Sequence, residues 1–133
     1  MSNAFERALA VGLKGGLALS RAALTYTRPV PGDDPLTVSL TGTQGKKLFK
    51  IQEPGQVVVV VKSVDFLIAV ADLVVDDVAT EPAKYDEIAR VIGTKKRIYK
   101  VLPMGKEIPL FEYADTGQTV YRIHTKFDRE EPV

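Results

Sequence analysis

Residues 57–68 read VVVVVKSVDFLI, and this stretch decides the fold class. It opens with five consecutive valines, whose β-branched side chains favour extended backbone. Apolar residues then continue to Ile68, interrupted by Lys62, Ser63 and Asp65. The stretch predicts the clearest β-strand of the chain. Because the run is apolar on both faces, we expect both faces to be covered, by the core or by a partner subunit.

Asp65 is the unusual residue of this run. A carboxylate among apolar neighbours must be paired, capped or exposed, since an isolated buried charge is costly. Backbone N–H groups at the end of the strand are suitable donors for it. We therefore expect Asp65 to have a structural role rather than a catalytic one.

Shorter strands are predicted on both sides of this stretch. Leu24 and Tyr26 alternate with threonines, and residues 36–41 alternate in the same way, which is typical of half-buried strands. The Pro- and Gly-rich segment 29–35 between them predicts a hairpin with a long loop. Further strand-like runs cover residues 46–51, 86–92, 96–102, 108–113 and 119–127. Turn-forming residues join the last four runs into two more hairpins.

The beginning of the chain has a helical period instead. Asn3 and Glu6 have the spacing of a capping box, and apolar residues recur every four positions from Phe5 to Leu17. This pattern predicts an amphipathic helix over residues 3–21. The predicted fold is therefore mainly β, a small β-barrel or β-sandwich with an N-terminal α-helix. We expect one domain, with a helical segment 1–22, a β domain 23–127 and a flexible tail 128–133.

Composition excludes several classes of site. The 133 residues include no cysteine and one histidine, which rules out disulfides, thiolate zinc sites and any site that needs two imidazoles. The net charge of +1 provides no global field for binding nucleic acid. Charged residues interrupt the apolar segment 5–24, so we expect a soluble, unprocessed chain without a membrane span.

The candidate catalytic and metal-binding residues are few. His124 lies between Arg122 and Lys126 on the polar face of the last predicted strand, so we expect it to face solvent or an interface. Adjacent acidic residues point to opposite faces of a strand, which makes a sequence pair a poor metal or acid–base site. We therefore expect solvated loops at the three acidic pairs, Asp33-Asp34, Asp76-Asp77 and Glu130-Glu131. No catalytic residue, cofactor or metal site is predicted.

Two small basic clusters lie at the ends of predicted strands. They consist of Lys46, Lys47 and Lys50, and of Lys95, Lys96 and Arg97. Repeated around a ring, such charges could line a channel that passes DNA through phosphate contacts alone. On a monomer they would be an ordinary solvated surface. These six residues are the candidate DNA or interface contacts.

From about Leu19 to Phe127 the order of several segments carries a family resemblance. These segments are Leu24–Arg28 (LTYTR), Ser63–Ile68 (SVDFLI), Ala71–Leu73, Glu81–Pro82, Asp86–Ile88 (DEI), Tyr99–Val101 and Tyr121–Lys126 (YRIHTK). In this order and spacing the chain resembles small head–tail joining proteins of tailed phages and prophages. It resembles tail-attachment and head-closure (stopper) proteins more loosely. The family pattern has a glycine before Asp86, where this chain has Tyr85.

The resemblance implies a structural role in the virion. It implies a β-barrel or β-sandwich subunit without catalytic residues, which assembles in the host cytoplasm into a ring of six or twelve copies at the neck. The implied partners are further copies of the chain, portal or adaptor proteins, tail proteins, and double-stranded DNA that passes without sequence specificity. Residues 30–35 and 103–108 are then expected to be contact loops that become ordered on assembly.

Two other classes of function remain open from the residues. The first alternative is a small ligand- or nucleic-acid-binding β-barrel, which needs a lined pocket or an aromatic platform. The chain has five tyrosines, five phenylalanines and no tryptophan, without a clustered stacking pattern. The second is an enzyme, which needs polar groups that converge in a pocket. The structural role is the favoured hypothesis.

Overall fold

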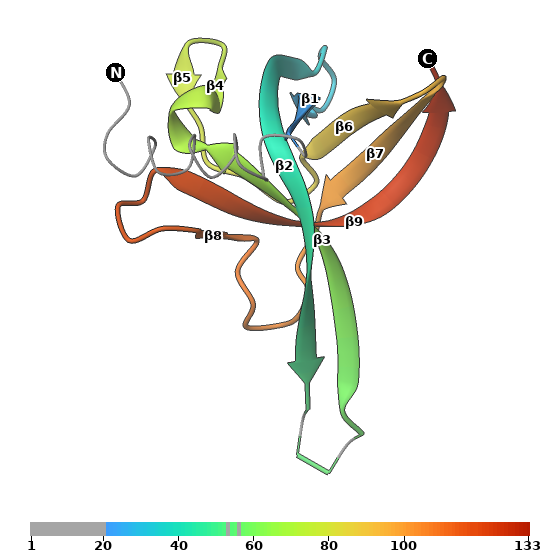
Figure 1. Ribbon diagram of the computed structural model, residues 1–133, viewed down its shortest axis with the longest axis vertical. Helices are drawn as coiled ribbons and strands as arrows, with labels where there is room; N and C mark the ends of the chain where they lie inside the picture. Colours follow the sequence, from blue (N-terminus) through green and yellow to red (C-terminus); the bar gives the residue numbers. More distant parts are fainter. Residues whose placement is uncertain (1–20, 53, 56) are drawn as a thin grey trace.

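The computed structural model describes residues 21–52, 54–55 and 57–133 and confirms a mainly β fold (Figure 1). A short 3-10 helix, η2 (Val70–Asp72), follows the third strand. The strands are β1 (Arg21–Arg28), β2 (Leu36–Ile51), β3 (Val59–Ala69), β4 (Val74–Val75), β5 (Val78–Ala79), β6 (Glu87–Ile92), β7 (Lys95–Val101), β8 (Phe111–Tyr113) and β9 (Val120–Pro132). The hairpins predicted around residues 29–35 and 93–94 are confirmed as β1–β2 and β6–β7.

The main sheet closes on itself. Seven strands follow the order β3-β2-β1-β6-β7-β9-β8, and β3 also pairs with β9. This additional antiparallel pairing runs from Val64↔Thr125 to Ala69↔Val120 and makes the sheet barrel-like. A separate hairpin consists of β4 and β5, joined by the predicted turn at Asp76 and Asp77. Both aspartates have positive φ, as a tight two-residue hairpin turn requires.

The core fills the inside of this barrel. The alternation predicted for β1 is confirmed, since Leu24 and Tyr26 are buried while their neighbours are more exposed. Tyr26 pairs with Ile88 across the sheet, and both side chains are fully buried. The other core residues are Leu40, Phe66, Ile68, Leu73, Val75, Tyr99, Val101, Tyr121 and Ile123.

One long strand joins two elements that the sequence suggested were separate. The strands predicted at residues 36–41 and 46–51 are the two ends of β2, which is 16 residues long. Its first half pairs with β1 and its second half with β3. Gly42 lies where β2 crosses the barrel wall, and a Cβ atom there would be 2.7 Å from the carbonyl oxygen of Leu67. Glycine therefore lets two backbones approach closely at this point.

The expectations for the two ends of the chain have different outcomes. The predicted helix over residues 3–21 lies outside the described residues except for Arg21, which already begins β1. The expected flexible tail is instead the end of β9, because residues 129–132 pair with residues 95–98 of β7. The backbone N–H of Val133 also donates a hydrogen bond to the carbonyl oxygen of Thr94, at 3.1 Å. In the part of the chain that the structure describes, no helix has the length and apolar character needed to cross a bilayer.

Two glycines of β2 provide a matched test of the close approach at Gly42. We expect Gly42→Ala to lower the free energy of unfolding by about 1–3 kcal/mol, because the added methyl group overpacks the wall against Leu67, Leu24 and Ile68. Gly45→Ala is the control, since nothing lies within 4 Å of its added Cβ atom. Urea denaturation of both variants measures the difference. Equal stability of the two variants would contradict the packing at Gly42.

Candidate assembly surface

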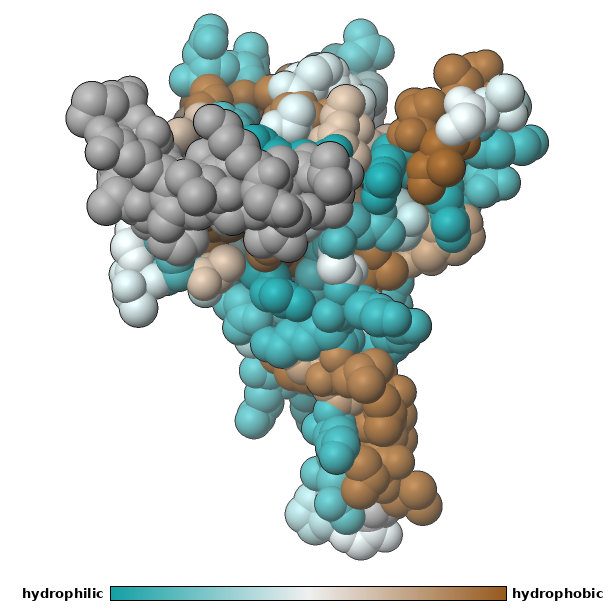
Figure 2. Space-filling model, in the orientation of Figure 1, coloured by the Kyte–Doolittle hydropathy of each residue, from teal (hydrophilic) through white to brown (hydrophobic). Residues whose placement is uncertain are grey.

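Half of β2 and the start of β3 form a hairpin that projects beyond the barrel (Figure 1). We call residues 44–63 the arm. Its side chains include Val57, which is 84% exposed, Leu48 at 62%, and Val59 and Val60 at 55% each. The core therefore does not cover the valine run, and of the two covers expected from the sequence a partner subunit is the one that stays a prediction. Figure 2 shows the resulting apolar surface along one side of the arm.

The two faces of the arm differ in chemistry. Directly opposed residues share a face of a hairpin, so the register assigns each side chain to one face. One face has Lys47↔Ser63 next to the barrel and is apolar beyond it, at the pairs Phe49↔Val61 and Ile51↔Val59. The other face mixes lysines with apolar residues in the pairs Lys46↔Val64, Leu48↔Lys62 and Lys50↔Val60. Surfaces of this kind, apolar and bordered by charge, are typical of protein contacts.

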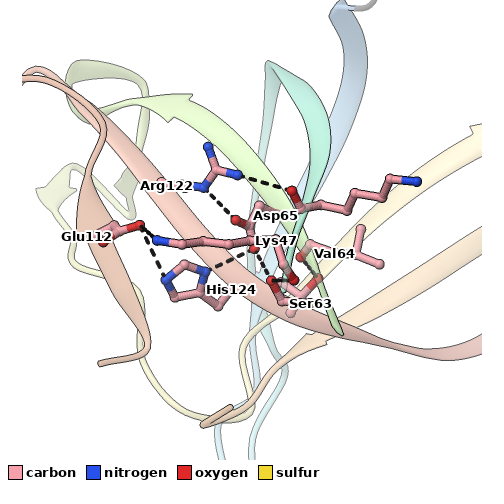
Figure 3. Close-up of polar contacts among 9 residues, drawn as sticks. Lys47, Ser63, Val64, Asp65, Glu112, Arg122 and His124 are labelled. Atoms are coloured by element: carbon pink, nitrogen blue, oxygen red, sulfur yellow. Dashed lines mark hydrogen bonds and ion pairs between the residues drawn. The ribbon is translucent and has the colours of Figure 1, made fainter. Parts of the chain in front are cut away.

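A buried polar cluster anchors the arm to the barrel (Figure 3). The Asp65 side chain is 1% exposed and accepts hydrogen bonds from Ser63 Oγ at 2.6 Å and from Arg122 Nε at 2.5 Å. His124 Nδ1 lies 2.9 Å from Asp65 Oδ1, the carboxylate oxygen that also accepts from Ser63. The prediction that Asp65 is paired is thus confirmed, with side chains rather than backbone N–H groups as its partners.

His124 is buried, and the prediction that it faces solvent is wrong. Its side chain is 1% exposed, and the edge of its ring packs against Phe49 with centroids 5.1 Å apart. The backbone N–H of His124 donates to Leu110, and its Nε2 lies 3.8 Å from Glu112 Oε1. The segment around β8 therefore covers the outer face of β9, which the alternation along β9 alone could not indicate.

Hydrogen bonding keeps Asp65 charged. Burial alone would raise the pKa of its carboxyl group, because an ionised group loses hydration there. The hydrogen bonds from His124, Ser63 and Arg122 outweigh this effect, so the pKa of Asp65 lies below its usual value. An ionised Asp65 therefore holds β3 to β9 at the point where the arm begins.

A second buried carboxylate fixes the segment before β6. Asp86 accepts hydrogen bonds from the Tyr26 hydroxyl, from Arg28 Nη2 at 2.7 Å and from the backbone N–H of Ala83 at 2.9 Å. Burial and the neighbouring Asp86 raise the pKa of Tyr26, which stays protonated as a donor. Tyr85 has a φ of +75°, in the left-handed region that glycine favours. This conformation explains why the family pattern has a glycine at that position.

The two predicted basic clusters lie on different projections of the molecule. Lys46 and Lys50 are exposed on the arm, whereas Lys47 is half-buried and pairs with Glu112 at 2.8 Å. Lys95, Lys96 and Arg97 lie on β7 at the other end of the barrel. We call this projection the wing, and it consists of residues 90–98 and 126–132 (Figure 1). A single chain therefore does not bring the two clusters together.

Two basic residues that the sequence did not single out lie beside the arm. Lys62 and Arg90 line a shallow hollow of about 430 Å³ together with Lys46, and Arg90 NH1 donates to Gln44 Oε1 at 2.8 Å. Each of them is an isolated charge in an apolar strand, so neither forms a cluster in sequence. The pairing of β2 with β3 and the barrel closure bring them next to Lys46.

The loop predicted to become ordered on assembly already packs on the arm. Met104 is 3% exposed, and a Cβ atom on Gly105 would lie 2.8 Å from Ile51 Cδ1. Residues 103–108 therefore support the apolar face of the arm, which corrects the expectation for this loop. Residues 31–35 are exposed, as a contact loop would be.

Comparison with known families gives one match. A family model described as phage head-tail joining protein matches residues 3–132. The match thus extends over nearly the whole chain and confirms the resemblance drawn from the separate segments. No match was found among curated proteins.

Replacement of Asp65 tests the anchoring cluster. We expect Asp65→Asn to lower the free energy of unfolding at pH 7 by about 3 kcal/mol. This value is at the low end of the cost of breaking a buried ion pair, because Arg122 is partly exposed. The pKa of Asp65 is lower in the folded state than in the unfolded state. Its contribution to the free energy of unfolding is therefore complete above the ordinary carboxyl pKa of about 4, and it is lost as the pH falls through the folded-state pKa. Urea denaturation should therefore show a difference in the free energy of unfolding between the wild type and Asp65→Asn that becomes smaller at acid pH.

The control for this comparison is Glu112→Gln. Glu112 also contacts His124, but its side chain is 39% exposed and its ion pair with Lys47 should contribute little. A pH-independent gap between the wild type and Asp65→Asn would contradict the charged state of Asp65.

Proposed function

The chain belongs to the phage head-tail joining protein family, and on this premise we propose that it forms a ring at the neck of the virion. Family membership makes it a structural component that joins the phage head to the tail. The proposal adds a ring of six or twelve copies that contacts portal or adaptor proteins on one side and tail proteins on the other. Assembly takes place in the host cytoplasm, and double-stranded DNA passes through the ring. The chain acts as a single domain.

The exposed apolar surface of the arm carries this proposal. A protein that stays monomeric rarely exposes a contiguous apolar patch without a partner for it. The arm exposes Val57, Val58, Val59, Val60 and Leu48, each at least 44% exposed. A neighbouring subunit would cover these side chains. Cover by a partner subunit is one of the two possibilities expected for the valine run from the sequence.

The basic residues support passage of DNA. Lys46 and Lys62 of the arm gather with Arg90 of β6 although the whole chain has a net charge of only +1. Repeated around a ring, such a local patch would contact phosphates without reading the bases. The six candidate contacts, Lys46, Lys47, Lys50, Lys95, Lys96 and Arg97, therefore remain proposals for lumen or interface residues.

The alternative functions have less support. Among the described residues, large side chains such as Tyr26, Tyr99 and Phe66 are buried in the barrel interior, where a ligand-binding barrel would have its pocket. Ser63, Asp65 and His124 are residue types of a hydrolytic triad, but Asp65 lies between the other two and contacts both. A triad needs the serine next to the histidine and access for a substrate. The first requirement is not met because both residues make their described contacts with Asp65, and the second is not met because Ser63 and His124 are buried.

The double variant Val58→Asp, Val60→Asp tests the role of the arm. Both side chains are exposed in the single chain, so we expect the thermal melting temperature to stay within a few degrees of the wild type. Assembly into rings should be lost, because two carboxylates would have to be buried in the contact. Size-exclusion chromatography with light scattering, together with negative-stain microscopy, measures the size and shape of the particles.

A matched control places the same charge elsewhere. Val78 in β5 is 63% exposed, and Val78→Asp should leave both melting and assembly unchanged. Rings that form normally from the arm variant would refute the proposed role of the arm. A wild-type protein that stays monomeric at all concentrations and in the presence of portal and tail proteins would refute the ring.

A further inference from the structure

The barrel opens into a fork where β3 and β9 separate. These strands pair with each other only from Val64↔Thr125 to Ala69↔Val120. Beyond that point β3 continues into the arm beside β2, while β9 continues into the wing beside β7. In Figure 1 the arm points downward and the wing points to the upper right. Within the described residues, each of these strand segments pairs on one side only, so residues 59–63 and 126–132 each present an open edge.

Open strand edges are reactive surfaces for assembly. Their unpaired N–H and C=O groups can add a strand from another chain, and stable monomers usually shield them. Here apolar side chains adjoin both edges instead. Leu48 and Val60 lie beside the edge on the arm, and Phe127 is 45% exposed beside the edge on the wing. Val91 and Ile92 add further exposed apolar surface to the wing.

The arm differs in charge from the β9 segment of the wing, although the other segment of the wing, residues 90–98, has four basic residues and no acidic one. The described residues of the arm include four lysines and no acidic residue. Residues 126–132 have three acidic residues against two basic ones, a net charge of −1. Lys50 and Lys62 on the arm are exposed, and so is Glu130 on the wing. Two arms placed together would oppose lysine to lysine, whereas an arm placed along the β9 edge of the wing would bring its lysines near Asp128 and Glu130.

We propose that the arm of one copy docks on the wing of a second copy of this chain, with the β3 edge beside the β9 edge. This inference rests on the proposed ring and identifies the contact that builds it. One chain cannot make the contact alone, because its own arm and wing diverge from the junction at Val64. The contact joins two different surfaces, so each added copy presents a new arm and a new wing. Such a head-to-tail contact forms a closed ring when the rotation between copies closes.

The absence of cysteine from the chain permits a direct crosslinking test. Two singly substituted proteins, Val60→Cys on the arm and Glu130→Cys on the wing, are mixed, with a tag on one of them. Mild oxidation, or a short bis-maleimide linker, should join one copy of each in a dimer of mixed composition. The matched control replaces the arm protein by Val78→Cys, whose side chain is similarly exposed on β5. We expect a mixed dimer yield at least severalfold above this control.

A charge-reversal series tests the same contact without crosslinking. Lys50→Glu with Lys62→Glu should weaken assembly roughly tenfold, and Glu130→Lys with Glu131→Lys in the same chain should restore it. Reversal of Lys84, an exposed lysine outside the arm and the wing, should have no effect. Failure of the second pair to restore assembly would count against a direct contact.

Light scattering on the same samples separates this contact from the ring itself. Rings with mixed crosslinking at the control level overturn the arm–wing contact and leave the ring intact. Predominant crosslinking between two Val60→Cys copies indicates an arm–arm contact. This result also overturns the arm–wing contact. A protein that remains monomeric overturns both the contact and self-assembly into a ring.

Discussion

The pairing of β3 with β9 is the constraint on which the rest of the structure depends. It closes the sheet into a barrel, and the charged Asp65 secures it through Arg122 and His124 on the outer face. One residue further along each strand the pairing ends, so the same junction also directs the arm and the wing apart. The barrel and its two projections are thus consequences of one short ladder and the buried carboxylate beside it.

The sequence predicted the barrel strands well because alternation requires only local information. The patterns at Leu24 and Tyr26 and at Tyr121 and Ile123 identify the faces that the structure buries. The valine run shows where this reasoning ends. β-branching specifies a strand, but the residues do not indicate whether the chain itself or another molecule covers it. The charged C-terminal segment resembles a flexible tail in composition, yet Arg97 and Glu130 lie opposite each other in the β7–β9 ladder.

The candidate site depended more on tertiary structure. Asp65 was predictable because a carboxylate in an apolar strand needs a partner. The burial of His124 was not predictable, since the segment that covers it comes from around β8. The residues two positions away on either side, Arg122 and Lys126, are cations of the kind that usually face solvent. Lys62 and Arg90 join Lys46 only when three strands are brought together. Tyr85 is a further case, because the sequence shows only that it replaces a glycine, whereas the structure shows the left-handed backbone that glycine favours.

The unbroken course of β2 has a mechanical consequence. Its backbone hydrogen bonds run from the barrel wall to the arm without a bulge or a hinge, and Gly42 brings it against the backbone of β3 at the wall. A load applied at the tip is therefore transmitted as torque to the barrel wall rather than absorbed by local bending. In the proposed ring, subunits joined through such levers would share a load that is applied to any one of them.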